Sequence, residues 1–383
     1  MIAWKQRKLN EVLSFLKDGT HGTHADDENG PLLLSAKNIK NGKIICDETD
    51  RRISEEEYEK IHTNFSLEVG DVLLTIVGSI GETAILKDCS SITFQRSVAF
   101  LRPNGTITSD FLYSEIQTQK FQNELDSRKS TSAQPGIYLG DLSEVPIVFT
   151  TNLDEQTKIG DYFNNLDHLI TLHQQKITLL TKLKKAMLEK MFPKKGSVIP
   201  EIRFNGFANA WEQRKVSELF RVTRGYVLAA TQTETEKTDE KPYPVYSSQT
   251  KDKGLMGYYK DYLYEDAITW TTDGANAGTV NYRAGKFYCT NVCGVLLSNE
   301  VKANQMIAEA LNNVAKGYVS YVGNPKLMNN VMADIVIQIP THPEEREQIS
   351  SFFANLDHLI TLHQRKIDKL KNLKKAMLDQ MFI

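Results

Sequence analysis

The sequence lacks the features that would place it in or beyond a membrane. It has no run of about 18 apolar residues, the length that a membrane-spanning helix needs. Its opening, MIAWK, does not lead into an apolar stretch of signal-peptide length. Its four cysteines are too few for a disulfide framework. These absences argue against membrane insertion and secretion, and we expect a cytoplasmic protein.

Neither sign of charge is in excess. The 46 lysines and arginines and the 48 acidic residues give a net charge of −2. A strongly basic composition is the usual footprint of a nucleic-acid-binding protein, so any DNA-binding prediction must find its positive charge in patches. Hydrophobic residues make up 40% and charged residues 25% of the chain, as in ordinary globular proteins, and 383 residues indicate two or three domains.

The motifs that usually mark an enzyme are also missing. The chain has no Gly-x-Gly-x-x-Gly, no phosphate-binding Gly-x-x-x-x-Gly-Lys-Ser/Thr and no Asp/Asn-Pro-Pro-Tyr/Phe motif of adenine methyltransferases. His21-x-x-His24 and Cys289-x-x-x-Cys293 could each supply half of a metal site, but neither has a matching second pair nearby. We therefore predict no catalytic, cofactor-binding or metal-binding residues in this chain.

What the sequence does contain is an internal repeat, the feature to seek first because it decides the fold. The decapeptide NLDHLITLHQ occurs twice, 190 residues apart, and 24 of 38 positions match between residues 155–192 and 345–382. A shorter repeat, AWKQRKLNEV and AWEQRKVSEL, opens each half at Ala3 and Ala210. Two similar frames around two different middle stretches indicate one scaffold that holds two different domains.

Each long repeat predicts a helix with a coiled-coil seam, because its apolar residues recur at alternating spacings of four and three. Each helix would be about 35 residues long, and the two are expected to pair with each other, in a direction that periodicity leaves open. The first seam is Ile159, Phe163, Leu166, Ile170, His173, Ile177 and Leu180. The second is Ile349, Phe353, Leu356, Ile360, His363, Ile367 and Leu370.

Three features of these helices have alternative interpretations. An apolar stripe off the seam, which includes Leu169 and Leu179, either packs on the chain's own globular parts or docks another subunit. The histidines in the seam either fix the register of the pair or bind a metal, and the first is favoured. The lysine clusters near both helix ends, which include Lys184 and Lys374, are interpreted as solvated charges that complement the helix dipole.

The middle stretches are predicted to be mixed α/β. Short β-rich runs punctuated by Gly, Asn and Asp occur at 31–34, 71–77, 83–86, 98–101 and 145–149, and again at 267–270, 278–282, 292–297 and 335–339. Helices are expected at 110–126 and 303–315. The fold class is therefore α+β. Two mixed α/β domains, 1–152 and 196–341, are joined by long helices within 153–195 and 342–383.

Several short motifs together resemble one family. The helices begin with DEQTKI at 154–159 and EEREQI at 344–349, and both contain LKKAML followed by Met-Phe. In the first middle stretch the motifs are DGTH, NIKNG and GDVLLT with Gly78-x-x-Gly81, and in the second YPVYSS. The whole pattern resembles the specificity subunit of type I restriction–modification systems. The lead IPEIRFNGF at 199–207 also resembles the family, which normally has a similar lead before the first domain, whereas this sequence starts just before Trp4.

The resemblance implies an architecture and a division of labour. Each middle stretch would be a target-recognition domain that reads one half of a bipartite, asymmetric sequence in double-stranded DNA. The helices would form an antiparallel coiled coil with pseudo-two-fold symmetry, set the spacing of the half-sites and dock two methyltransferase subunits. Those subunits would bring S-adenosylmethionine, and restriction/translocase subunits would bring ATP and Mg²⁺. The alternatives are a stand-alone DNA-modifying enzyme with an unrecognised site and a protein-binding scaffold.

Candidate DNA contacts come from clusters of basic, amide and aromatic residues, because Arg pairs with guanine and Asn or Gln with adenine in the major groove. These are Gln95, Arg96, Arg128, Lys129, Gln134, Arg221, Arg224, Tyr226, Gln249, Lys251, Arg283, Lys316, Tyr318, Tyr321, Asn324 and Lys326. The motifs that resemble the family add Thr20, His21, Asn38, Lys40, Ser79 and Ser248, and the turn at 273–276 adds Asn276. For each residue alone a solvated surface position is the favoured interpretation, so the prediction rests on the set.

Overall fold

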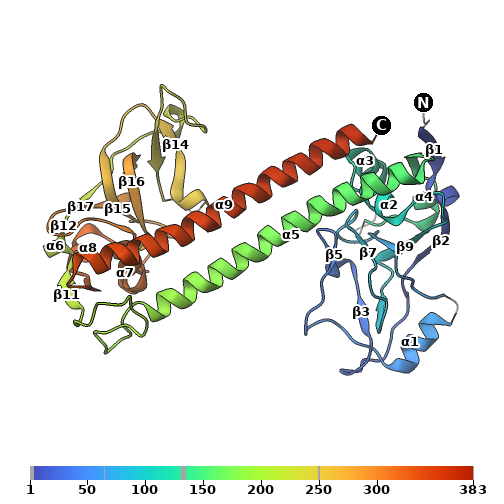
Figure 1. The fold of residues 1–383 in the computed structure, drawn as a ribbon, viewed down its shortest axis with the longest axis horizontal. Helices are drawn as coiled ribbons and strands as arrows, with labels where there is room; N and C mark the ends of the chain where they lie inside the picture. The colour runs from blue at the N-terminus through green and yellow to red at the C-terminus, as the bar shows by residue number, and fades with distance from the viewer. Residues whose placement is uncertain (1–3, 64, 131–134, 249–250, 383) are drawn as a thin grey trace. The chain divides into compact units, whose positions relative to one another are not determined.

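The computed structural model describes residues 4–63, 65–130, 135–248 and 251–382. The chain divides into two compact units, unit 1 with residues 1–175 and 364–383 and unit 2 with residues 176–363. The long helices α5 (Leu153–Lys190) and α9 (Pro343–Met381) each contribute to both units (Figure 1). No described helix has both the length and the apolar character that crossing a membrane requires.

Unit 1 is built on a four-stranded antiparallel sheet in the order β2-β9-β6-β7. Its strands are β2 (Leu13–Asp18), β9 (Val98–Pro103), β6 (Val72–Thr75) and β7 (Thr83–Ile85). The helices are α1 (Glu55–His62), α2 (Ser109–Ile116), α3 (Gln119–Ser127) and α4 (Leu139–Ser143). Further strands form three two-stranded sheets: β1 (Trp4–Lys8) with β10 (Pro146–Thr150), β3 (Leu32–Leu34) with β8 (Ile92–Phe94), and β4 (Ile39–Lys40) with β5 (Lys43–Ile44).

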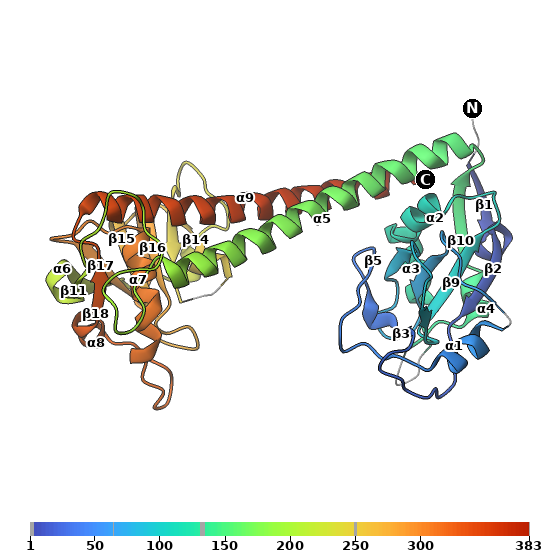
Figure 2. The same ribbon diagram turned by 60° about the horizontal axis from the view of Figure 1, so that its bottom comes forward.

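Alternation along the strands gives the sheet of unit 1 a core on each face. Val72 and Leu74 pack with α2, α3 and the beginning of α5, and Figure 2 shows α2 and α3 beside the sheet. Leu73 points the other way and packs with Leu34 and Phe94. Both faces are therefore covered, and the sheet exposes its strand ends rather than its faces.

Unit 2 contains a six-stranded sheet in the order β12-β17-β15-β16-β13-β14. Its strands are β12 (Phe220–Arg224), β17 (Cys293–Ser298), β15 (Tyr264–Thr271), β16 (Val280–Cys289), β13 (Tyr243–Tyr246) and β14 (Leu255–Tyr259). A separate ribbon pairs β11 (Glu212–Lys215) with β18 (Val336–Ile339), and the shorter helices are α6 (Val216–Leu219), α7 (Gln305–Ala315) and α8 (Asn329–Asp334). Ile268 and Trp270 belong to a core with α7, whereas Ala267 packs with Phe287 on the opposite face.

The two units share one frame although their middle stretches differ in sequence. In each unit an opening strand, β1 or β11, pairs antiparallel with the strand that precedes the long helix. A short helical turn follows, in which the N–H of Leu9 donates to the carbonyl of Val145 at 2.9 Å, and that of Val216 donates to Ile335 at 2.9 Å. The repeated AW-x-QRK segments are therefore the opening strands of equivalent domains, a role that their polar composition did not predict.

The long helices pair antiparallel in both units. In unit 1 the rings of Phe163 and Phe382 lie 5.9 Å apart, and Lys374 binds Asp167 at 2.6 Å. Unit 2 repeats both contacts at an offset of 190 residues, with Phe192 and Phe353 5.9 Å apart and Lys184 bound to Asp357 at 2.7 Å. Residue numbers rise along α5 as those of their partners fall along α9. The predicted α+β class with paired long helices is confirmed.

The exposure of the helices separates their two apolar stripes. All the predicted seam residues are buried or half-buried, and His173 and His363 are half-buried. The second stripe is largely open, because Leu169, Leu172, Leu179 and Leu183 are 40–59% exposed. Its counterparts on α9, Leu359, Leu362 and Leu373, are 38–42% exposed. The second stripe is therefore not covered by the described parts of either unit.

Two sequence-based expectations are wrong in detail. The helix expected at 110–126 is two helices, because Thr118 interrupts it and caps the second by accepting a hydrogen bond from the N–H of Phe121. Lys184 and Lys374 are not solvated dipole partners, since only 19% and 12% of their side chains are exposed and both bind carboxylates.

Candidate nucleic-acid interface

One edge of the main sheet in unit 1 collects most of the predicted contacts of that unit. Strands β2 and β6 end at this edge, and β7 and β9 begin there, so residues 19–24, 76–82, 94–97, 128–130 and 135–137 gather as loops. Thr20 forms a parallel bridge with Gln95, and the N–H of Arg96 donates to the carbonyl of Thr20 at 3.0 Å. The N–H of Ile137 donates to the carbonyl of Ile76 at 2.9 Å. We call this the loop edge of unit 1.

Gly19 holds the first of these loops tightly against the third. The N–H of Gly19 donates to the carbonyl of Val98 at 3.0 Å, and a Cβ on Gly19 would lie 2.1 Å from the carbonyl oxygen of Phe94. No side chain fits in that space, so the position requires glycine. Thr20 is thereby fixed between Phe94 and Arg96 by backbone contacts on both sides.

Unit 2 builds its loop edge in the same way. The N–H of Gly225 donates to the carbonyl of Cys293 at 2.9 Å, and that of Tyr226 donates to Cys289 at 3.1 Å. A Cβ on Gly225 would lie 2.2 Å from the carbonyl oxygen of Cys289. Gly225 and Tyr226 therefore occupy the positions that Gly19 and Thr20 occupy in unit 1.

The loop edge of unit 2 also carries a projecting hairpin, residues 319–327. Ser320 and Lys326 pair across it, and the N–H of Gly274 donates to the carbonyl of Pro325 at 2.9 Å, which ties the hairpin to the 272–278 turn. At its tip Tyr321 is 70% and Val322 is 92% exposed. The hairpin carries one lysine, Lys326, and no carboxylate of its own, although Asp273 of the neighbouring turn lies 3.8 Å from that lysine. A lysine beside an apolar or aromatic tip suits contact with a phosphate backbone.

The structure brings together one group of the predicted contacts. In unit 1 the loop edge includes Thr20, His21, Ser79, Gln95, Arg96, Arg128 and Lys129. In unit 2 it includes Arg224, Tyr226, Ser248, Asn276, Tyr318, Tyr321, Asn324, Lys326 and, at the base of the hairpin, Lys316. Arg221 lies near the other end of β12, and Lys40 lies in the separate β4–β5 ribbon. Gln134 and Gln249 fall outside the described residues, as does the side chain of Lys251.

Two predicted contacts are buried and need correction. Asn38 is 4% exposed and donates to the carbonyl of Ile45 and to Asp50, both at 2.9 Å. Arg283 is 6% exposed, lies 3.6 Å from the ring centroid of Tyr246 and donates to the carbonyl of Lys253 at 2.7 Å. Both polar groups are used to hold loops together, so neither side chain faces solvent.

Charge at the loop edge of unit 1 is unevenly available. Arg128 is paired with Glu124, and Lys129 with Asp126, so the end of α3 carries no net positive charge. His21 Nε2 lies 2.6 Å from Asp18 Oδ2, and 62% of the His21 side chain is exposed. Arg96 is exposed beside Gln95, which makes it the most accessible guanidinium of this edge.

A second group of polar residues joins α5 to α9 within each unit. Lys184 binds Glu309 at 2.8 Å and Asp357 at 2.7 Å. Burial lowers the pKa of Lys184, but the two carboxylates outweigh it and raise the pKa above its usual value. In unit 1 Lys374 binds Asp167 and the side-chain oxygen of Gln117, each at 2.6 Å. We call these two groups the helix clamps.

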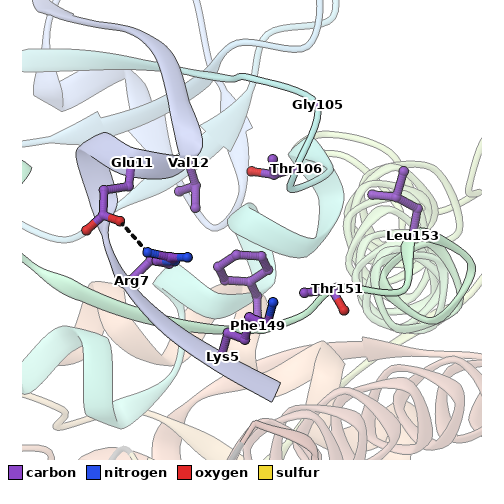
Figure 3. A pocket seen from close by; sticks show the side chains of 9 residues that line it. All are labelled: Lys5, Arg7, Glu11, Val12, Gly105, Thr106, Phe149, Thr151 and Leu153. Atoms are coloured by element: carbon purple, nitrogen blue, oxygen red, sulfur yellow. Dashed lines mark hydrogen bonds and ion pairs between the residues drawn. The ribbon is translucent and has the colours of Figure 1, made fainter. Parts of the chain in front are cut away.

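Unit 1 also contains a pocket of about 360 Å³ at the far end of the sheet from the loop edge. Figure 3 shows Arg7 bonded to Glu11 on one wall, Phe149 at the base, and Gly105 and Leu153 on the other side. The equivalent arginine of unit 2, Arg214, is bound by both Glu218 and Glu300. The pocket holds none of the predicted DNA contacts.

The sequence-based search missed two sets of residues that organise these sites. Gly19 and Gly225 each precede a predicted contact, and a single glycine before a polar residue is too common a pattern to single out. The clamp residues were detectable from the repeat. Lys184 and Lys374 lie at matching positions, and so do Asp167 and Asp357. A lysine at a seam position facing an aspartate predicts a cross-helix pair once the helices are antiparallel.

Comparison with known proteins gives one consistent result. A family model described as the type I restriction modification DNA specificity domain matches residues 1–182 and 208–372. The N-terminal part of a type I specificity subunit from Mycoplasma pneumoniae is 37% identical over 140 residues, which cover 36% of this chain and 73% of that protein. The MjaX specificity subunit of Methanocaldococcus jannaschii is 22% identical over 98% of this chain and 92% of its own.

A solved structure shares the fold over the full length. The crystal structure of a type I restriction–modification S subunit from M. genitalium superimposes with a TM-score of 0.75 at 16% identity. The match covers 100% of this chain and 96% of that one. At this identity the likeness supports the fold of the chain.

Proposed function

Since this chain belongs to the family of type I restriction–modification DNA specificity domains, we propose that it is a DNA-reading subunit in which each unit reads one half of a bipartite, asymmetric target. The observation that carries the proposal is the pair of loop edges. Gly19–Thr20 and Gly225–Tyr226 have the same backbone anchoring and different side chains. Equivalent frames with different polar edges are what two readers of different sequences need.

The electrostatics of the chain agree with localised DNA contact. The net charge is −2, so attraction to phosphate has to come from the loop edges, where Arg96, Arg224 and Lys326 are exposed. Phosphate contacts release counterions, and affinity then falls steeply with salt. Duplex binding that weakens with salt would distinguish this proposal from a scaffold that binds only protein.

An exchange experiment tests the division into two readers. Residues 4–150 are replaced by the corresponding stretch of another family member, and the methylated motif is read genome-wide in cells that carry the assembled system. We expect one half of the motif to change and the other half to stay. A simultaneous change of both halves would contradict independent readers.

We also propose that the open leucine stripe docks methyltransferase subunits, one on each long helix. Leu172 and Leu179 are 45% and 59% exposed on α5. Burying such side chains contributes roughly 1.5–3 kcal/mol each in a well-packed interface. The double substitution Leu172→Gln with Leu179→Gln should therefore weaken subunit binding by at least tenfold. Lys176→Gln, an exposed polar position on the same helix, serves as the matched control.

The chain itself is proposed to be non-catalytic, acting in the cytoplasm with its DNA target. Its sequence contains neither a nucleotide-binding loop nor the adenine methyltransferase motif. S-adenosylmethionine would act on the methyltransferase subunits, and ATP with Mg²⁺ on restriction/translocase subunits. The purified chain should transfer no methyl group to DNA until methyltransferase subunits are added. Turnover by the chain alone would favour the alternative of a stand-alone DNA-modifying enzyme.

The paired helices are proposed to set the distance between half-sites. Matched insertions of seven residues after Gln175 and after Arg365 keep the seam in phase and lengthen each helix by about 10 Å. That length corresponds to about three base pairs if the helices follow the DNA axis. The methylated motif should keep its bases and gain spacing. An unchanged spacer in a folded, active complex would contradict this role.

A further inference from the structure

Three side chains form a chain of hydrogen bonds behind the loop edge of unit 1. Thr20 Oγ1 lies 2.6 Å from His24 Nε2, and His24 Nδ1 lies 2.8 Å from Glu57 Oε2. Only 8% of the His24 side chain is exposed. Glu57 comes from α1, so the chain connects a loop residue at the edge to a helix elsewhere in the unit.

The direction of these hydrogen bonds follows from the carboxylate. The hydrogen bond from His24 lowers the pKa of Glu57, and Lys60 donates to its other oxygen at 3.3 Å. Ionised Glu57 can only accept, so His24 Nδ1 donates. The assignment then holds for the neutral form of His24, in which the other ring nitrogen, Nε2, carries the lone pair. The hydroxyl of Thr20 is the group that donates to it.

This arrangement leaves Thr20 with no proton to offer. A threonine hydroxyl has one proton and two lone pairs, and the proton is engaged by His24. The N–H of Gly22 approaches the oxygen at 3.4 Å, which occupies one lone pair weakly. Thr20 is half-buried, and its oxygen therefore retains acceptor capacity and no donor.

We propose that Thr20 is a base-reading residue of fixed polarity, which accepts a hydrogen bond from an exocyclic amino group of adenine or cytosine. In the major groove these amino groups are the donors, whereas guanine and thymine present a carbonyl oxygen in the same region. Thr20 would repel that oxygen because it has no proton to give. The inference rests on the proposed function and assigns to one residue of unit 1 the chemical class that it recognises.

The backbone around Thr20 is rigid enough for such discrimination. Its N–H donates to Phe94 at 2.9 Å and its carbonyl accepts from Arg96 at 3.0 Å, while the close approach at Gly19 prevents the strand from sliding. Tyr226, the equivalent residue of unit 2, is 63% exposed, and its hydroxyl can donate as well as accept. The two equivalent positions therefore recognise base edges by different rules.

The first experiment uses the complete complex with its methyltransferase subunits and reads the methylated motif genome-wide. Thr20→Val keeps the shape and removes the hydroxyl, and Thr20→Ser keeps the hydroxyl as the matched control. We expect Thr20→Val to relax one position of one half-site, with about a fivefold to tenfold loss of affinity for the cognate duplex. Thr20→Ser should retain the motif, and the half-site read by unit 2 should not change.

The second experiment tests the polarity itself with base analogues. At the position relaxed by Thr20→Val, adenine is replaced by purine, or cytosine by 2-pyrimidinone, each of which lacks the amino group. The wild-type complex should lose about fivefold to tenfold in affinity, and the Thr20→Val complex should lose nothing further. Glu57→Gln can donate as well as accept, so it no longer fixes the direction of the hydrogen bonds through His24. This variant should reduce the preference for the amino base severalfold.

The outcomes separate this inference from the proposed function. A wild-type complex without any bipartite motif would remove the proposed function and this inference with it. A clear wild-type motif that Thr20→Val leaves unchanged would overturn the inference alone. An equal loss of affinity for all sequences would also overturn it, because it would make Thr20 a backbone contact. Were Thr20→Val to melt unit 1, the analogues would be placed at each adenine and cytosine of the half-site in turn, and the wild-type and Glu57→Gln complexes would decide the question.

Discussion

The two helix clamps use the same lysine–aspartate pair and complete it differently. In unit 2, Lys184 joins Asp357 to a second carboxylate, Glu309, which is 6% exposed. In unit 1, the residue that corresponds to Glu309 is Tyr113, whose hydroxyl donates to Asp167 at 2.8 Å. The repeated helices thus supply a constant pair, and each recognition domain supplies its own third member.

This difference shows where sequence divergence is tolerated. Each lysine–aspartate pair lies on the repeated helices, so a change in one pair has to suit only the unit that contains it. The third member lies on α2 or α7, within the stretches that differ between the units. A recognition domain can therefore be exchanged as long as it contributes a side chain that forms an ion pair with the lysine or a hydrogen bond with the aspartate.

The largest expected effect is from breaking the clamp of unit 2. Lys184→Met leaves Glu309 buried without its cation, since Lys253 reaches only Asp357, at 3.1 Å. Removing one partner of a buried pair typically costs about 3–5 kcal/mol. We expect the free energy of unfolding of unit 2 to fall by about 3 kcal/mol, measured by hydrogen exchange resolved along the chain.

Lys374→Met is the matched variant in unit 1. It leaves one carboxylate, Asp167, which is 26% exposed and keeps its hydrogen bond from Tyr113. We expect a loss of about 1 kcal/mol. Lys185→Met, at an exposed position beside the clamp, should change little. Equal losses for Lys184→Met and Lys374→Met would show that the third member of each clamp is irrelevant.

A smaller effect is expected from Glu115, which has an apolar counterpart, Leu311, in unit 2. Glu115 is 3% exposed, its Oε2 has no partner among the described residues, and burial raises its pKa from 4.5 to about 7. The protonated carboxyl therefore favours the folded state below pH 4.5, and this contribution is lost as pH rises through about 7.

Glu115→Gln tests this contribution by removing the charge and keeping the shape. It should stabilise unit 1 at pH 8 by about 1–2 kcal/mol and flatten its stability between pH 5 and 8, as followed by thermal unfolding. Leu311→Met in unit 2 provides a control without a titratable group. A variant with the wild-type pH dependence would place the transition in some other group.

The last expected effect concerns DNA affinity and the hairpin of unit 2, residues 319–327. Stacking of a base on an aromatic ring contributes roughly 1–3 kcal/mol. Tyr321→Ser should therefore reduce the affinity for cognate duplex by about tenfold without changing the stability of unit 2. Tyr262→Ser, at the opposite end of β15, is the matched control for loss of a partly exposed tyrosine. Identical affinities would remove the hairpin from the interface.

The sequence predicted the helices better than the domains, for a physical reason. The apolar seam of a 38-residue helix is a strong signal, because the same spacing of apolar residues recurs from turn to turn. The opening strand β1 reads WKQRK and has four exposed residues of five, so it lacks the alternation that indicates a strand. Its structure comes from pairing with β10, a strand 138–146 residues away in the sequence, which local pattern does not encode.

The candidate contacts show the same limit. Residue type alone could not separate Arg96, which is exposed, from Arg283, which is buried against Tyr246. It also could not show that Thr20 shares its proton with His24, since the tie to Glu57 in α1 closes only in the folded chain. Clusters of polar residues located the loop edges, and burial then decided which members can reach a partner.

The order of synthesis gives Phe382, which directly follows α9, a special position. The core of unit 1 contains Phe382, which lies 6.1 Å from Trp4 and 5.0 Å from Phe111 by ring centroids. Ribosomes add about 5–20 residues each second, so roughly 10–40 seconds separate Gln175 from Phe382. Unit 1 thus waits for the residues at the end of α9 before its core is complete. In that interval its open apolar surface is exposed to chaperones and proteases, and a nascent chain cut short anywhere in α9 would leave the first domain unfinished.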